Sequence, residues 1–251
     1  TFTSGLSLPS NLEFGPSGDL FVFETGSGEI SRIMSDGTVT IFASGFARKE
    51  SYLAFNPQGD LYVNQGWPFY RVTPNGTIIP LALLRDRTPA CFRDMTFDSS
   101  GNLYVADGTG SRVLKILPNN TFSVLVGGFM SSGLAVGQSG DIFAIDTASI
   151  RESPTSVGIL KVSPNGTSTT FVTVSGMAND IDFDAFGNLY VTIFDEGEIL
   201  KISPEGEIST FVNGLRGPSS LSFGPSGDLF VFEYYTGHIL RITLNRVASI
   251  Y

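Results

Sequence analysis

Short apolar strands alternate with polar turns along the whole chain, and one such arrangement recurs six times. The clearest copies read FGPSGDLFVFE at residues 14–24 and again at 223–233, where an apolar run follows a turn rich in Pro, Ser and Gly. This punctuation is typical of a β-hairpin. The glycines of the six turns are 41, 42, 39, 47 and 40 residues apart, a period typical of propellers and solenoids. They are Gly18, Gly59, Gly101, Gly140, Gly187 and Gly227.

Each copy predicts four strands. The second strand is an uninterrupted apolar run, such as LYVTIF at 189–194, which indicates a sheet covered on both faces. A third strand such as EILKI at 198–202 and a tight turn ending in glycine then lead into a fourth strand. No stretch shows helical periodicity over three turns, so we predict an all-β fold.

The two ends of the chain decide between a closed ring and an open stack. Residues 1–6, TFTSGL, copy TFVNGL at 210–215 in the fourth strand of the fifth copy, whereas the sixth copy ends soon after its third strand. A ring in which the first strand completes the last blade hides both sheet edges. We therefore predict a single domain over residues 1–251. It is a six-bladed β-propeller of four-stranded antiparallel blades, closed by the N-terminal strand at 1–6, with a tail at 244–251 outside the pattern.

Charge and hydropathy narrow the class of partner. The formal net charge of −9 argues against nucleic acid, because binding to phosphate backbones needs clustered Lys and Arg. No apolar run approaches the roughly 18 residues that a membrane span needs, so we expect no insertion into a membrane. The chain begins at Thr1 rather than Met, and we expect a processed protein that is secreted or periplasmic and monomeric.

The candidate chemistry lies at one face of the predicted ring, where first strands begin and second strands end. Oxygen ligands without Cys or His favour Ca²⁺ or Mg²⁺. The alternative is that each acid after a second strand bonds the backbone of its own turn. Asn179, Asp94 and Asp180 do not recur from copy to copy and are therefore stronger candidates. The carboxylates expected at this mouth are Glu24, Asp94, Asp107, Asp146, Asp180 and Glu233.

Two segments resemble known repeat families. GNLYVADGTGSRVLKI at 101–116 resembles the NHL repeat, and the FGPSGDLFVFE copies resemble the repeats of streptogramin lyase and, more distantly, of the gluconolactonase (SMP-30) group. The latter resemblance implies a calcium ion on the channel axis that polarises an ester or lactone carbonyl, with Asn179-Asp180 similar to an Asn-Asp element of that group. The lyase resemblance implies histidine chemistry, for which the chain has only His238.

These observations define a set of candidate site residues. We expect Asp180, Asp94 and His238 to act in catalysis, although the default interpretation of His238 is a solvated loop residue. Asn179, Asp180, Asp94 and Glu24 are the main candidate metal ligands, with Asp107, Asp146 and Glu233 beside them. The residues expected to contact a small-molecule substrate are Asn11, Trp67, Arg93, Arg151, Tyr234 and Tyr235.

The leading hypothesis is a divalent-cation-dependent hydrolase that acts on an ester or lactone at the channel mouth. A second hypothesis is a non-catalytic propeller that binds a protein or glycan partner. A third is a lyase of the streptogramin type.

Overall fold

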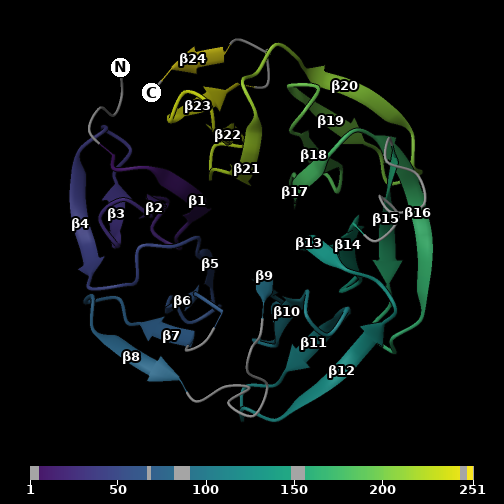
Figure 1. Ribbon diagram of the computed structural model, residues 1–251, viewed down its shortest axis with the longest axis horizontal. Coiled ribbons are helices and arrows are strands. Elements are labelled where there is room, and N and C mark those ends of the chain that lie inside the picture. Colours follow the sequence, from purple (N-terminus) through teal and green to yellow (C-terminus); the bar gives the residue numbers. More distant parts are fainter. Residues whose placement is uncertain (1–5, 67–68, 82–90, 148–155, 244–247, 251) are drawn as a thin grey trace.

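The computed structural model describes residues 6–66, 69–81, 91–147, 156–243 and 248–250. These residues form six four-stranded antiparallel sheets, arranged as the blades of a ring around a central axis (Figure 1). The described residues contain no α-helix, and hence none long and apolar enough to cross a membrane. The predicted all-β, six-bladed propeller is confirmed.

Each blade is a meander of four consecutive strands. Blades one and two consist of β1 (Pro9–Phe14), β2 (Leu20–Glu24), β3 (Glu29–Ile33), β4 (Val39–Ser44), β5 (Tyr52–Phe55), β6 (Leu61–Asn64), β7 (Phe69–Val72) and β8 (Ile78–Leu81). Blades three and four consist of β9 (Phe92–Phe97), β10 (Leu103–Asp107), β11 (Arg112–Ile116), β12 (Phe122–Gly127), β13 (Ser131–Val136), β14 (Ile142–Asp146), β15 (Ser156–Val162) and β16 (Ser168–Ser175). Blades five and six consist of β17 (Ala178–Phe183), β18 (Leu189–Ile193), β19 (Glu198–Ile202), β20 (Ile208–Val212), β21 (Pro218–Phe223), β22 (Leu229–Glu233), β23 (His238–Ile242) and β24 (Ala248–Ile250).

The first strand of every blade lies next to the axis and the fourth lies at the rim (Figure 1). The turn between the first two strands depends on glycine, because its backbone enters the left-handed region that other residues avoid. Gly18 has φ 81° and its N–H donates to the carbonyl of Gly15 at 2.9 Å, and Gly227 repeats this turn with φ 80°. The repeated glycines of the sequence therefore set the register of each inner hairpin.

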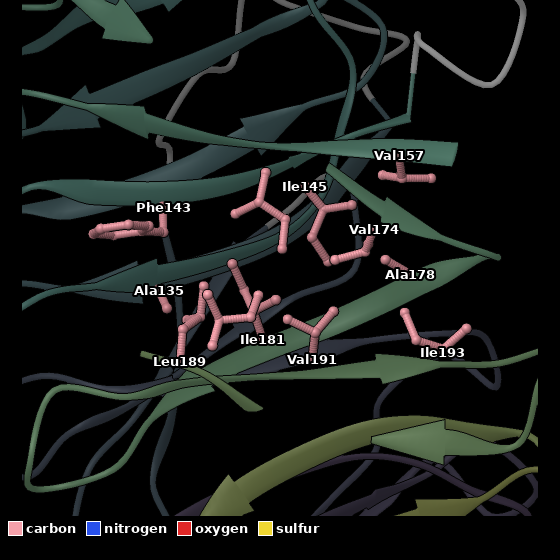
Figure 2. Packing of buried hydrophobic residues seen from close by; sticks show 12 residues of the cluster. Ala135, Phe143, Ile145, Val157, Val174, Ala178, Ile181, Leu189, Val191 and Ile193 are labelled. Carbon is pink, nitrogen blue, oxygen red and sulfur yellow. The ribbon is translucent and has the colours of Figure 1, made fainter. Parts of the chain in front are cut away.

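The core lies between neighbouring blades. Figure 2 shows this packing between blades four and five, where Phe143 and Ile145 of β14 face Ile181 of β17 and Val191 of β18. All four side chains are buried. This arrangement explains the uninterrupted apolar second strands, because the two adjacent blades cover both faces of each one.

One aromatic contact repeats at three of these junctions. The ring of Phe143 on the second strand meets Phe171 on the fourth strand of its blade at 5.2 Å and Phe183 on the first strand of the next blade at 5.0 Å, both edge to face. Tyr190 meets Phe211 and Phe223 in the same way, and Phe21 meets Phe42 and Phe55. Edge-to-face pairs of this kind add stabilisation beyond the burial of area.

Blades one and six close the ring by apolar packing. Leu12 and Val22 of blade one share a buried cluster with Phe232 and Ile239 of blade six. Phe14 also meets Phe230 edge to face at 4.9 Å between ring centroids.

The outer strand of the sixth blade differs from the sequence-based prediction. It is β24, from the C-terminal segment that the sequence pattern left unplaced, and it pairs with β23 through Leu240↔Ile250 and Ile242↔Ala248. We had predicted this strand at residues 1–6. Of that segment, residues 1–5 lie outside the described residues, and Leu6 packs against the cluster between blades one and six. A three-residue strand without a recognisable turn before it gives too weak a pattern to find in the sequence.

Candidate functional site

The inner strands carry β-bulges at one end of the channel. The pairing of first and second strands shifts register between Pro9 and Asn11 in blade one and between Ala178 and Ile181 in blade five. Blades three, four and six show the same irregularity at the same end. A bulge re-aims the side chains around it. Buried Thr192 of β18 holds the bulge of blade five, since its hydroxyl accepts the N–H of Asp180 at 3.0 Å.

The bulged ends surround a mouth cavity of about 750 Å³. Its polar lining includes Asn11, Arg93, Asp94, Asn179 and Asp180, all of which the sequence singled out. Its apolar lining includes Tyr52, Met177, Phe194, Phe232 and Tyr234. Small-molecule sites typically combine apolar walls with a few polar groups in this way.

A second space of about 370 Å³ lies along the inner strands and shares Asn11, Asp94 and Asp180 with the mouth cavity. It adds Glu13 and Asp182, which lie two residues further along β1 and β17. Side chains two residues apart face the same side of a strand. The channel therefore carries two levels of acidic and amide side chains, and sequence reasoning had assigned no site role to Glu13 or Asp182.

The two mouth aspartates bind the backbone of the following blade. Oδ2 of Asp94 accepts the N–H of Leu134 at 2.6 Å, and Oδ2 of Asp180 accepts the N–H of Leu221 at 2.9 Å. The second oxygen of each carboxylate accepts the N–H of the next residue in its own strand, at 2.8 and 2.9 Å respectively. Each aspartate thus links two blades.

The same linkage recurs in alternate blades. Oδ1 of Asn11 accepts the N–H of Leu53 at 3.0 Å, and Oδ2 of Asp182 accepts the N–H of Phe223 at 3.0 Å. Blades one, three and five therefore supply acceptors for the first strands of blades two, four and six. A first strand is the inner edge of its sheet, where an unpaired N–H would be costly to bury. The side chains of the alternate blades accept these N–H groups.

Burial in the channel raises the pKa of its carboxyls. Desolvation raises the pKa of Asp180 to about 6 and that of Asp182 to about 7. The pKa values of Glu13 and Asp94 are raised well above their usual range, first by desolvation and then by the charges of the neighbouring aspartates. Hydrogen bonds from backbone N–H groups oppose these shifts without cancelling them.

The prediction that six carboxylates converge on the mouth does not hold for the four acids at the ends of second strands, because none of them lines the mouth cavity. Glu24 accepts the N–H of Ser7 at 2.5 Å and the hydroxyl of Ser31. Glu233 accepts the N–H of Arg216 at 2.7 Å and the hydroxyl of Thr236 at 2.9 Å.

Asp107 shows the same local bonding. Its carboxylate accepts the N–H of Gly110 at 2.9 Å and the Nε–H of Arg112 at 2.8 Å. Asp146 ends β14 and, like the other three acids, is not among the residues that line the mouth cavity. The alternative interpretation of these acids, as partners of their own turns, is therefore observed for Asp107 and Glu233. Glu24 instead bonds Ser7, which precedes the first strand, and Ser31 of the third strand.

The remaining predicted residues divide into three groups. Tyr234 lines the mouth cavity, and Tyr235 packs beside it with 5.5 Å between ring centroids. His238 is exposed at the start of β23 and is not among the lining residues. Trp67 and Arg151 lie outside the described residues.

The described residues do not fit the calcium site that the gluconolactonase resemblance implies. No three acidic, His or Cys side chains in the described part of the chain come together around one point. Asp94 and Asp180 lie on different blades, and two backbone N–H groups fix the orientation of each carboxylate. The candidate oxygen ligands are therefore spread over alternate blades, because each carboxylate bonds at a different junction between blades.

We therefore expect calcium to leave the stability unchanged. A single site that is present only in the folded state would add about 2.7 kcal/mol at a hundredfold excess over its dissociation constant. For a domain of this size, that gain corresponds to roughly 5–10 °C. Thermal melts of the purified protein with added Ca²⁺ or with a chelator should agree within about 1 °C. A rise of several degrees with Ca²⁺ would contradict this expectation.

Comparison with known proteins places the fold among six-bladed propellers of several functions. The sequence matches no protein-family profile and no curated protein. Its fold is similar to that of a catalytically inactive histidine-to-alanine variant of virginiamycin B lyase from Staphylococcus aureus with quinupristin, with a TM-score of 0.72, 17% identity, and coverage of 99% of this chain and 85% of that one.

Two further solved structures show how widely this fold is used. A gluconolactonase from Xanthomonas campestris has a TM-score of 0.77 at 14% identity, covering 92% of this chain and 84% of that one. Nidogen in its complex with laminin has a TM-score of 0.74 at 16% identity, covering 87% of both chains. At this level of identity the likeness shows the propeller fold alone, and function has to be argued from the site.

Proposed function

We propose that this propeller binds a small organic molecule in the mouth cavity, through contacts that need no metal ion. The observation that supports this most is the composition of the cavity, which combines an apolar wall containing Phe194 and Tyr234 with the carboxyls of Asp94 and Asp180. A volume of about 750 Å³ is within the range of small-molecule sites.

Filling the cavity tests this proposal. Ser219 lines the cavity, so Ser219→Trp places a large ring where the ligand would lie. Saturation-transfer NMR with a mixture of small amines, alcohols, lactones and sugars should show ligand signals with the wild-type protein and lose them with Ser219→Trp.

The matched control for this experiment is Ser168→Trp, an exposed position on the rim strand β16. It should retain the ligand signals of the wild type. Equal signals from Ser219→Trp and Ser168→Trp would contradict binding in the mouth cavity, as would the absence of any signal from the wild type.

Hydrolysis of an ester or lactone is a second candidate, favoured by the two mouth aspartates. With a pKa of about 6, Asp180 is mostly ionised at neutral pH and is suited to accept a proton from water. Asp94, with a pKa raised well above its usual range, is suited to donate a proton to the leaving oxygen. An ester and lactone panel tests this candidate. Absence of turnover, or turnover that survives Asp180→Asn, would contradict it.

A streptogramin-type lyase is less well supported. In virginiamycin B lyase, the variant with alanine in place of a histidine is described as catalytically inactive. The single histidine of this chain, His238, is exposed and does not line the mouth cavity.

A further inference from the structure

The charges around the mouth cavity are strongly unbalanced. Among the described residues that line the cavity and the space beneath it are five carboxyls and one guanidinium. The guanidinium is that of Arg93, and the carboxyls are those of Glu13, Glu50, Asp94, Asp180 and Asp182. The ionised forms of these carboxyls attract cations and disfavour anions, and a bound cation in turn favours the ionised forms over the protonated ones.

A buried hydroxyl at the same wall has no partner. The Oγ atom of Ser219 is inaccessible to solvent, forms no hydrogen bond, and belongs to a residue that lines the mouth cavity. The neighbouring Ser220 differs, since its hydroxyl accepts from the side-chain amide of Asn11 at 3.4 Å. A buried polar atom without a partner is uncommon, and a rotation of this side chain toward the cavity would let a bound ligand supply the missing hydrogen bond.

An aromatic shelf lies on the same side of the mouth, over blades five and six. It consists of Phe194, Tyr234 and Tyr235, whose rings contact one another with centroids 5.5 to 5.9 Å apart. Tyr235 and Phe194 close over Gly217, where an added Cβ would lie 2.8 and 3.0 Å from their rings. The packed shelf nevertheless leaves Tyr234 and Tyr235 62% and 69% exposed. Exposed apolar groups gathered beside a cavity mark a binding surface.

We propose that the ligand of the mouth cavity is an organic ammonium compound with an aromatic or apolar body. This inference rests on the binding function proposed above. The ammonium group pairs with the carboxylate of Asp180, and the body of the ligand packs against Phe194 and Tyr234.

The hydrogen-bonding capacity of these groups matches an ammonium head. Each carboxylate oxygen has two lone pairs, and the backbone N–H that it accepts uses one of them. The remaining lone pairs of Asp180 accept N–H donors of a primary ammonium. The positive charge also offsets the mutual repulsion of the buried carboxyls, and an aromatic face adds a cation–π contribution.

Three compounds of similar size and different charge test the ligand class. They are 2-phenylethylamine, 2-phenylethanol and 3-phenylpropionate, titrated calorimetrically into the wild-type protein at neutral pH. The amine should bind at least about tenfold more tightly than the alcohol, because charge-assisted hydrogen bonds are roughly twice as strong as neutral ones. The carboxylate should bind most weakly.

Two variants separate the contributions of charge and shelf. Asp180→Asn should reduce the affinity for the amine to that for the alcohol and leave the alcohol unchanged. Asp180→Glu keeps the charge and should retain a preference for the amine, and it provides a second variant in case the first unfolds. Tyr234→Ala should lower the affinity for the amine and for the alcohol alike, because it removes part of the apolar wall that both compounds contact.

The outcomes distinguish this inference from the binding function on which it rests. If the alcohol or the carboxylate binds as tightly as the amine, the ammonium assignment is overturned and the binding function stands. Failure of the wild type to bind any of the three also overturns the assignment. The binding function is then decided separately by the comparison of Ser219→Trp with Ser168→Trp.

Discussion

Phe143→Ala is expected to lower the free energy of unfolding by about 4 kcal/mol. The Phe143 side chain, labelled in Figure 2, is 6% exposed. Its ring meets Phe171 of its own blade and Phe183 of the next one. Its removal therefore leaves a cavity between two blades and breaks two aromatic pairs. The expected fall in melting temperature is roughly 10 °C for a chain of this length.

The control for this prediction is Phe186→Ala, at a turn position that is 78% exposed. It removes the same number of atoms and should change the melting temperature by no more than about 1 °C, since surface substitutions are usually nearly neutral. A fall for Phe143→Ala no greater than that for Phe186→Ala would show that packing between blades contributes little to the stability of the ring.

Stability is expected to fall as the pH rises from about 5 to 8, because the channel carboxyls prefer their protonated forms in the folded protein. Asp182 illustrates the sign. Its pKa is raised from 3.8 to about 7, so the folded state holds a proton that the unfolded state has already lost between these values. The stabilisation from this proton is fully present below the pKa of the unfolded state and is lost as the pH rises through 7.

The size of the effect follows from the shift. For Asp182 the loss in free energy of unfolding is about 2–4 kcal/mol, where the lower figure allows for screening by solvent in the channel. Asp182→Asn should therefore melt at a higher temperature than the wild type at pH 8 and close to it at pH 5. Melting temperatures of both proteins across this range check the prediction. A wild type that becomes more stable as the pH rises would contradict it.

The repeat made the fold predictable from the sequence. The glycine turns, such as those at Gly18 and Gly227, and the apolar second strands specify the blade, and six copies specify the ring. The strand that completes the sixth blade was not predictable in the same way. Residues 1–6 copy the expected outer strand closely, whereas β24 is three residues long and carries no turn signal.

The site was only partly predictable. Asp94, Asn179 and Asp180 were identified because they depart from the repeat, and the bulges of the inner strands bring them to the mouth cavity. Glu24 and Glu233 were candidates because of their place after the second strand, but each accepts a backbone N–H from just before the first strand of its blade, Ser7 and Arg216 respectively. These partners lie 17 residues earlier in the chain, and the spacing of the acids does not reveal them.

The sequence of the inner strands could also have predicted that Glu13 and Asp182 lie in the channel. Both lie two residues beyond mouth positions, and the two-residue period of a strand places them in the channel. Applied to the inner strands, this period predicts both levels of polar side chains in the channel. What the period does not predict is that alternate blades supply the acceptors, because that depends on the approach of each side chain to the next blade.

The central claim is that the inner-strand aspartates are buried acceptors of backbone N–H groups from the next blade rather than ligands of a metal ion. A pH titration followed through the amide proton shifts of Leu221 and Phe223 tests it most directly, because these N–H groups bond Asp180 and Asp182. The account predicts midpoints of about 6 for Leu221 and about 7 for Phe223, unchanged by added Ca²⁺. Midpoints near the ordinary aspartate value of about 4, or amide shifts that follow Ca²⁺, would contradict it.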